Sequence, residues 1–444
     1  MKRSKKLISL CIAAMLFAGL SGCGKDSSII EENYLKIDEN SIDLKGRTIT
    51  VSIPGNAPLE DSSSIGDSYA KHLNDLMLKR QKEAEKKYNC KIEWKPNNVM
   101  VQTLSSLKAG TNTDDIIYVS SAFGSLEMAH KGLIEPLDDY IDYSNGVYSD
   151  IAQSKTIWNG KHYGIVADYA VLAPYFTYNK DLILSEGLSD PYEMMLSDQW
   201  TWDSFLEIAK KTTKDTNGDG EPDVWGIEGT FSQLFENFIF TNGGDYVVQE
   251  EGQYKLAFDT EPVKNSMQFV INMYRTDKVV YDSSLQSNLK KNIFSEGSAA
   301  FTTGTSTGNE DFEVGKVCLP KGPNAEDYIA YSAAGDMYSI PSNVKDKKSV
   351  AAVMSTLFSY YDSEKEDYIK PEEGYRNSIP EGLIKVMKNK PRYSWFVSSK
   401  SYTNALLSVY QDIMRKGMSI EEAFELNKGA FTNGIMMLNQ PNGQ

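Results

Sequence analysis

The sequence predicts a mixed α/β protein built from two lobes. Its 444 residues are far more than one small domain needs. Strand and helix patterns alternate as βαβαβ in the first third, and a second group of α and β elements follows. With 41% hydrophobic and 24% charged residues, the composition is that of a packed globular protein.

The first third supplies the clearer alternation. Residues 47–53 alternate β-branched and polar side chains before a Pro-Gly-Asn break, which predicts a strand. Residues 68–88 place apolar side chains at helical spacing among charges, which predicts an amphipathic helix on a sheet. A strand at 90–94, a short helix at 104–109 and a continuously apolar strand at 115–119 complete the unit.

The second group is less regular. An apolar, aromatic stretch at 163–178 predicts an extended crossing segment, and 328–341 is extended again. The chain has no internal repeat, which disfavours solenoids and propellers. Further elements are expected as helices beginning at 179 and spanning 201–211, 231–240 and 262–274, a strand at 299–303, and helices in most of the remainder.

Net charge argues against nucleic acid as a partner. The chain has 46 basic and 61 acidic residues, so 46 − 61 gives −15. Such a field repels phosphate backbones, whereas nucleic-acid binding requires clustered Lys and Arg.

The N-terminus has the pattern of a secretory signal. Four basic residues precede an apolar stretch at 7–20, which is too short for a permanent membrane helix. Leu20-Ser21-Gly22-Cys23 resembles a bacterial lipobox, in which the cysteine receives diacylglycerol before cleavage. We therefore expect residues 1–22 to be removed and Cys23 to be acylated. An ordinary signal peptide with an incidental cysteine is the alternative.

Cleavage would leave an acidic lipoprotein. Removal of four basic residues changes the balance to 42 − 61 = −19. Acyl chains on Cys23, palmitate among them, would anchor the protein to the extracytoplasmic face of the cell membrane, with 23–43 as a tether. Cys90 and Cys318 would remain, too few for a disulfide framework; burial as small hydrophobes is favoured over a bridge.

Six segments, in order, resemble the family 1 extracellular solute-binding proteins of ABC transporters. Their order and spacing extend over nearly all of the mature chain, and the lipobox precedes them. They are DDIIYVSSAFGSLEMAHKGLIEPLDDYI from Asp114, YFTYNKDLILSEGL from Tyr175, QWTWDSFLEIAKKTT from Gln199, NIFSEGSAAFTTG from Asn292, LPKGPN from Leu319 and SAAGDMYSIPSN from Ser332.

The resemblance implies the two-lobe periplasmic-binding-protein-like (type II) fold, with a hinged cleft that captures ligand. It implies lobe one at 44–165 plus 309–360 and lobe two at 166–308 plus 361–444. The implied function is delivery of a carbohydrate, an oligosaccharide, to ABC permease subunits by a monomer without enzymatic activity. The maltodextrin-binding member of the family has tryptophans where Val119 and Ser306 stand, so a different oligosaccharide is expected.

Sugar sites combine planar polar groups with aromatic rings, and the turns after parallel strands are where such ligands bind. For each aromatic residue hinge packing is the alternative, and for Asn56 it is turn chemistry. Matched to the family pattern, the candidate ligand residues are Asn56, Ser120, Ser121, Asp168, Tyr175, Phe231, Gln233, Thr305, Asp336 and Tyr402.

A loop at 215–223 has calcium-like spacing. Oxygen-bearing side chains stand at positions one, three, five, seven and nine around a glycine at six. Position twelve is Gly226 instead of the bidentate Glu of an EF-hand, so Glu228, a carbonyl or water would complete the shell. An ordinary acidic turn is the alternative. The predicted ligands of a structural Ca2+ are Asp215, Asn217, Asp219, Glu221 and Asp223.

A secreted, lipid-anchored hydrolase is the competing class. Gly304-Thr305-Ser306-Thr307-Gly308 fits a nucleophile elbow, but that arrangement needs a later histidine, and the histidines all precede it. Glycosidase chemistry needs only two carboxylates, which an acidic chain always offers. A lectin-like adhesin would show β-rich repeats, which the sequence lacks.

Overall fold

The computed structural model describes most of the chain after the N-terminal segment. The described residues are 35–65, 68–96, 100–120, 124–145, 155–166, 174–282, 284–285, 292–304, 310–332, 336–358, 379–388, 392–393 and 400–440.

The first sheet confirms the three strands predicted in the first third. β1 (Arg47–Ile53) and β2 (Cys90–Pro96) pair in parallel along their whole length. β3 (Ile117–Val119) lies beside β1 through a parallel bridge between Val51 and Ile116. β14 (Met337–Ser339) pairs antiparallel with β3, so a segment from far along the chain completes the sheet.

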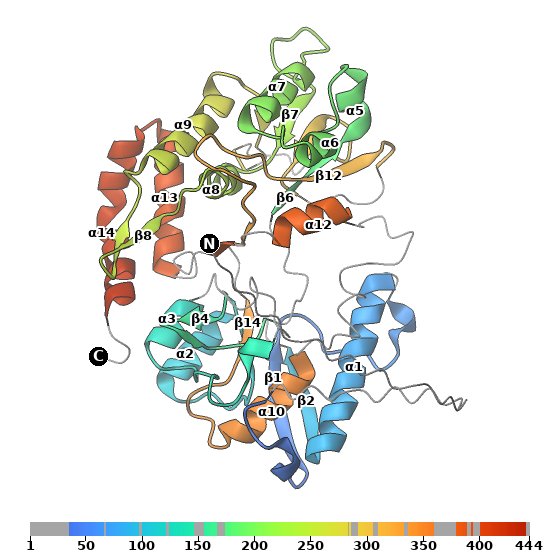
Figure 1. Cartoon of the computed structure of the whole chain (residues 1–444), viewed down its shortest axis with the longest axis vertical. Helices are drawn as coiled ribbons and strands as arrows, with labels where there is room; N and C mark the ends of the chain where they lie inside the picture. Colours follow the sequence, from blue (N-terminus) through green and yellow to red (C-terminus); the bar gives the residue numbers. More distant parts are fainter. Residues whose placement is uncertain are drawn as a thin grey trace, which may run out of the picture. The chain divides into compact units, whose positions relative to one another are not determined.

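Helices cover this sheet as the amphipathic pattern predicted. α1 (Ser68–Tyr88) packs against β2 and α10 (Lys347–Phe358), and Figure 1 shows these helices beside the strands. Their apolar faces bury Ala84 and Tyr88 with the side chains of β1 in one hydrophobic core. Two further helices of this region are α2 (Met100–Ala109) and α3 (Ser125–His130).

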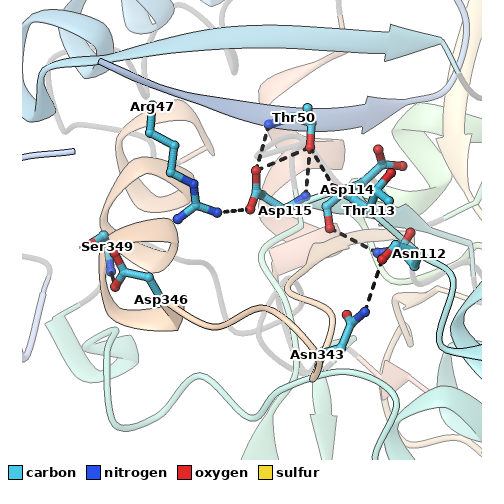
Figure 2. A network of polar contacts seen from close by, with 9 residues as sticks. All are labelled: Arg47, Thr50, Asn112, Thr113, Asp114, Asp115, Asn343, Asp346 and Ser349. Atoms are coloured by element: carbon cyan, nitrogen blue, oxygen red, sulfur yellow. Dashed lines mark hydrogen bonds and ion pairs between the residues drawn. The ribbon is translucent and has the colours of Figure 1, made fainter. Parts of the chain in front are cut away.

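A polar network joins β1 to the residues that immediately precede β3. Asp115, just before β3, accepts hydrogen bonds from the Thr50 amide (3.1 Å) and hydroxyl (3.3 Å) and pairs with the Arg47 guanidinium. Asn112 and Asn343 continue the network toward α10, as Figure 2 shows. Asp115 is 8% exposed, and these contacts of its carboxylate join the start of β3 to β1. This end of the sheet is therefore structural.

The second sheet has five strands. β7, β10, β11 and β12 run parallel to one another, and β6 lies antiparallel between β11 and β12. In spatial order the strands are β10 (Val280–Tyr281), β7 (Trp225–Glu228), β11 (Ala299–Thr302), β6 (Tyr175–Asn179) and β12 (Val314–Cys318).

Helices with defined caps surround this sheet. Thr201 and Thr230 cap α7 and α8 through capping boxes, and Asp190 caps α6 with Pro191 in its first turn. α13 and α14 pack against each other (Figure 1). The helices are α5 (Lys180–Ser185), α6 (Pro191–Leu196), α7 (Trp202–Thr212), α8 (Phe231–Thr241), α9 (Glu261–Arg275), α12 (Glu381–Lys388), α13 (Lys400–Lys416) and α14 (Ile420–Asn439).

An aromatic core fixes the second sheet against its helices. Trp200 is fully buried, donates its indole N–H to the Cys318 carbonyl (2.7 Å) and packs edge-on to Phe205. Phe301 of β11 and Phe176 of β6 complete the cluster. Fully burying each such ring contributes about 1.5–3 kcal/mol to the free energy of unfolding.

Cys90 and Cys318 are free and buried, which confirms the preference for buried thiols over a bridge. No helix within the described residues is both long and apolar enough to span a bilayer. The remaining elements are η1 (Glu39–Ser41), η2 (Ser62–Ser64), η4 (Tyr143–Asn145), the hairpins β4 (Ile157–Trp158) with β5 (Lys161–His162) and β8 (Val247–Glu250) with β9 (Gln253–Leu256), and the pair β13 (Tyr331–Ser332) with β15 (Arg392–Tyr393).

Candidate functional site

The carboxyl end of β3 brings two predicted residues together. Ser120 follows β3 directly, and Asp336 stands immediately before β14, whose Met337 pairs with Val119. The Tyr118 hydroxyl donates to Asp336 Oδ2 at 2.5 Å. Burial and this hydrogen bond raise the pKa of Tyr118, so the hydroxyl stays protonated and remains a donor. A carboxylate is thus held beside a serine at the strand end.

Asn56 lies past the end of the neighbouring strand. It follows β1 by three residues and is exposed, after Gly55 turns the chain with a φ of 80°. Because β1 and β3 are parallel neighbours, Asn56 and Ser120 both belong to loops at the same edge of the first sheet.

The corresponding edge of the second sheet places Gln233 beside β11. Thr303, which follows β11, approaches Gln233 Oε1 with its hydroxyl at 3.1 Å. Gln233 also accepts from Thr230 (2.8 Å), so its side chain is fixed at the first turn of α8. Gly229 allows this close approach, since a Cβ there would lie 2.9 Å from the Thr303 hydroxyl.

Tyr175 begins β6 at this same edge, opposite Cys318 at the end of β12. The ammonium group of Lys316 lies 5.9 Å from the centre of the Tyr175 ring. Lys316 is buried to 6% exposure, and desolvation lowers its pKa to about 8. A half-buried aromatic ring and a cation therefore stand together at the strand ends.

Two predicted residues lie in the core. Phe231 is buried, and its amide donates to Asp282 Oδ2 at 2.7 Å. Tyr402 is fully buried and packs edge-on against Tyr246 and Phe431. These contacts agree with the alternative that the aromatic rings serve in packing. Ligand contact by either residue stays a prediction. Ser121, Asp168 and Thr305 lie outside the described residues, as does Ser306 of the elbow motif.

Sequence reasoning missed Tyr118, Thr303 and Lys316. Lys316 had a visible signal, because a lone lysine interrupts the apolar strand VGKVC. Tyr118 had none, since its position in DIIYV also fits a buried strand. Its role depends on pairing with a strand more than two hundred residues away.

The calcium-like loop is held by its own side chains. Asp223 accepts hydrogen bonds from the hydroxyl (2.7 Å) and the amide (2.8 Å) of Thr216 and from the amide of Asn217 (3.0 Å), and these contacts lower its pKa. Asp215 accepts from the amides of Gly218 and Gly220. Among the described residues, no three His, Cys, Asp or Glu side chains form a group that could hold a metal ion. Calcium binding by this loop stays a prediction.

The fold is that of substrate-binding proteins of known structure. A cyclic α-maltosyl-1,6-maltose binding protein from Arthrobacter globiformis has a TM-score of 0.64 at 15% identity and covers 88% of this chain and 99% of its own. An ABC substrate-binding protein from Listeria monocytogenes in complex with cycloalternan has a TM-score of 0.62 at 16% identity, covering 89% and 100%. The maltose/maltodextrin-binding domain from Bdellovibrio bacteriovorus, bound to maltotriose, has a TM-score of 0.58 at 16% identity, covering 88% and 100%. This confirms the predicted type II fold.

The family model described as bacterial extracellular solute-binding protein matches residues 67–360, and the chain belongs to this family. No curated protein matches the chain. The resemblance inferred from the six segments is therefore confirmed at the level of the family.

Proposed function

We propose that this protein is the carbohydrate-binding component of an ABC importer, capturing an oligosaccharide and delivering it to the permease. The single observation that supports this most is the pair of polar strand ends: Ser120 with Asp336 on the first sheet, and Gln233 with Thr303 on the second. Both edges present hydroxyl, amide and carboxylate groups, which match the hydroxyls of sugars. Structural neighbours that bind cycloalternan and maltotriose support the same substrate class.

Binding would follow from closure of the two lobes around the sugar. A ligand that contacts both lobes stabilises the closed form over the open form. Asp336 would accept hydrogen bonds from sugar hydroxyls while Tyr118 fixes its orientation. The Tyr175 ring would stack on an apolar sugar face.

Calorimetric titration with a panel of linear and cyclic oligosaccharides tests this proposal. We expect saturable binding of at least one saccharide, with the saccharide recovered unchanged. Asp336→Asn should weaken that binding about tenfold, because a hydrogen bond to a charged group contributes about 1.5–3 kcal/mol. Asp346→Asn, an equally conservative change at the α10 end of the network, is the matched control. Binding only of amino acids, peptides or metals would contradict the proposal, and shortened saccharides would indicate a hydrolase.

We further propose that Cys23 anchors the protein to the membrane through lipid. Two acyl chains give lasting attachment, whereas one is marginal. Metabolic labelling with a palmitate analogue should label the wild type and leave Cys23→Ser unlabelled and released from the cell. Equal retention of both proteins on membranes would exclude the anchor.

A further inference from the structure

Helix α8 is buried except along one polar stripe. Of its eleven residues, only Ser232, Gln233 and Glu236 keep contact with solvent. Residues three and four apart share one face of a helix, so these three lie together. Gln233 contacts Thr303 at the end of β11. The stripe therefore places Glu236 one helical turn from a side chain of the candidate ligand site.

Glu236 has no hydrogen bond or ion pair with any residue in the described part of the chain. Although the residue keeps some solvent contact, desolvation of its carboxyl raises its pKa to about 7 from the ordinary value of 4.5. A desolvated carboxylate without a partner is unfavourable by several kcal/mol in general. Glu236 therefore holds its proton more tightly than an ordinary glutamate does.

The titratable groups around Glu236 are tyrosines, and the hydroxyls of Tyr246, Tyr331 and Tyr410 have other hydrogen-bond partners. Tyr246 and Tyr410 share a hydrogen bond at 2.5 Å, and Tyr331 donates to the Asn237 side-chain oxygen. Burial raises the pKa of each tyrosine, and the negative charge of Glu236 adds to this increase. Tyr246 follows α8, Tyr331 lies on β13, and Tyr402 and Tyr410 lie on α13. The charge of Asp245 also raises the pKa of Tyr402.

We propose that the carboxyl group of Glu236 is a specificity-determining ligand contact, which accepts hydrogen bonds from the donor groups of a bound saccharide. This inference rests on the proposed carbohydrate-binding function. The shared ligand chemistry is a pair of hydrogen-bond donors, supplied either by neighbouring sugar hydroxyls or by the ammonium group of an amino sugar. Both replace the missing partner of the acid.

This contact couples sugar binding to protonation. Donors in the ligand stabilise the carboxylate, so the pKa of Glu236 falls in the complex and a proton is released near pH 7. Below the free-state pKa of about 7 the ligand must first displace a proton. Affinity should therefore rise about tenfold between about pH 6 and about pH 8.

Calorimetry at these two pH values, each in two buffers of different ionisation enthalpy, tests the proposal on the full chain. The probes are the best neutral oligosaccharide of the panel and a glucosamine oligosaccharide of equal length. We expect the wild type to show the tenfold pH effect and proton release, and Glu236→Gln to lose both. Glu236→Met, which keeps the packing volume but has no acceptor, should bind more weakly still. Glu207→Gln, an exposed acid on α7, is the matched control and should behave as the wild type.

The outcomes separate the two claims. If Glu236→Gln loses the pH effect with the neutral sugar, the donors to Glu236 are sugar hydroxyls. If it loses the effect only with the glucosamine oligosaccharide, the donor is the ammonium group. Either result supports the proposal. Wild-type affinity and proton release in both Glu236 variants would overturn it and leave the proposed function standing. Failure of the wild type to bind any saccharide would overturn the proposed function and this inference with it.

Discussion

Asp115 and Glu236 are acids in two regions with opposite surroundings. Asp115 sits at the start of β3, where a guanidinium, an amide and a hydroxyl satisfy its oxygens (Figure 2). Glu236 lies on α8, one helical turn from the Gln233 that contacts Thr303 after β11, and the described residues donate nothing to it. The amino ends of the strands hold the fold together, while the carboxyl ends keep polar groups available. This contrast distinguishes acids that stabilise the fold from acids that we propose bind ligand.

The largest expected effect tests the structural side of this contrast. Asp115→Ala leaves the Thr50 amide and the Arg47 guanidinium without their acceptor, so the free energy of unfolding should fall by about 3 kcal/mol. Urea unfolding followed by circular dichroism measures this. Asp114→Ala, next in the chain and in an ion pair with the partly exposed Lys95, should lose less than about 1 kcal/mol. Equal losses would show that the network adds nothing beyond a surface ion pair.

Removing the charge of Glu236 should have the next largest effect, and its sign depends on pH. A raised native pKa contributes stability below the unfolded value of 4.5, and that contribution is lost as the pH rises through about 7. Between about pH 5 and about pH 8 the wild type should therefore lose on the order of 2 kcal/mol relative to Glu236→Gln. Paired urea titrations at both pH values measure the difference. Parallel curves would mean that the carboxyl is well solvated.

A smaller effect is expected at the first sheet. Tyr118→Phe removes the donor that orients Asp336, so saccharide affinity should fall about fivefold, equivalent to about 1 kcal/mol. The phenyl ring keeps the edge-to-face contact with Tyr338, so folding should be preserved. Unchanged affinity in calorimetry would remove Asp336 from the ligand site.

The smallest effect concerns the loop at 215–223. If calcium binds there, addition at about ten times its Kd after chelation should raise the melting temperature by about 2 °C. Asp215→Asn should abolish the shift, because this acid reaches two loop amides and supplies the first predicted ligand position. Absence of heat and of any thermal shift would establish an ordinary turn.

The fold was largely predictable because periodicity reports local structure. The strands at 47–53 and 90–94 and the helix at 68–88 were found within a residue or two of their observed bounds. β14 could not be paired with β3 from the pattern alone, since register between distant segments depends on tertiary packing.

The site was predictable only in part. Gln233 and Asp336 were identified by matching the family pattern, and Asp336 lies within one of the six segments that resemble the family. Glu236 was missed, because a charged residue within FSQLFENFIF reads as the exposed side of an amphipathic helix. The tyrosines whose pKa values its charge raises lie on β13 and α13, and no local pattern brings these elements to α8.

Native mass spectrometry of the protein incubated with an equimolar mixture of oligosaccharides tests the central claim most directly. We expect one added mass per protein chain, equal to that of an intact saccharide from the mixture, and loss of that species when Asp336 and Glu236 are both replaced by their amides. A spectrum with no saccharide adduct, or with masses of saccharide fragments, would contradict it.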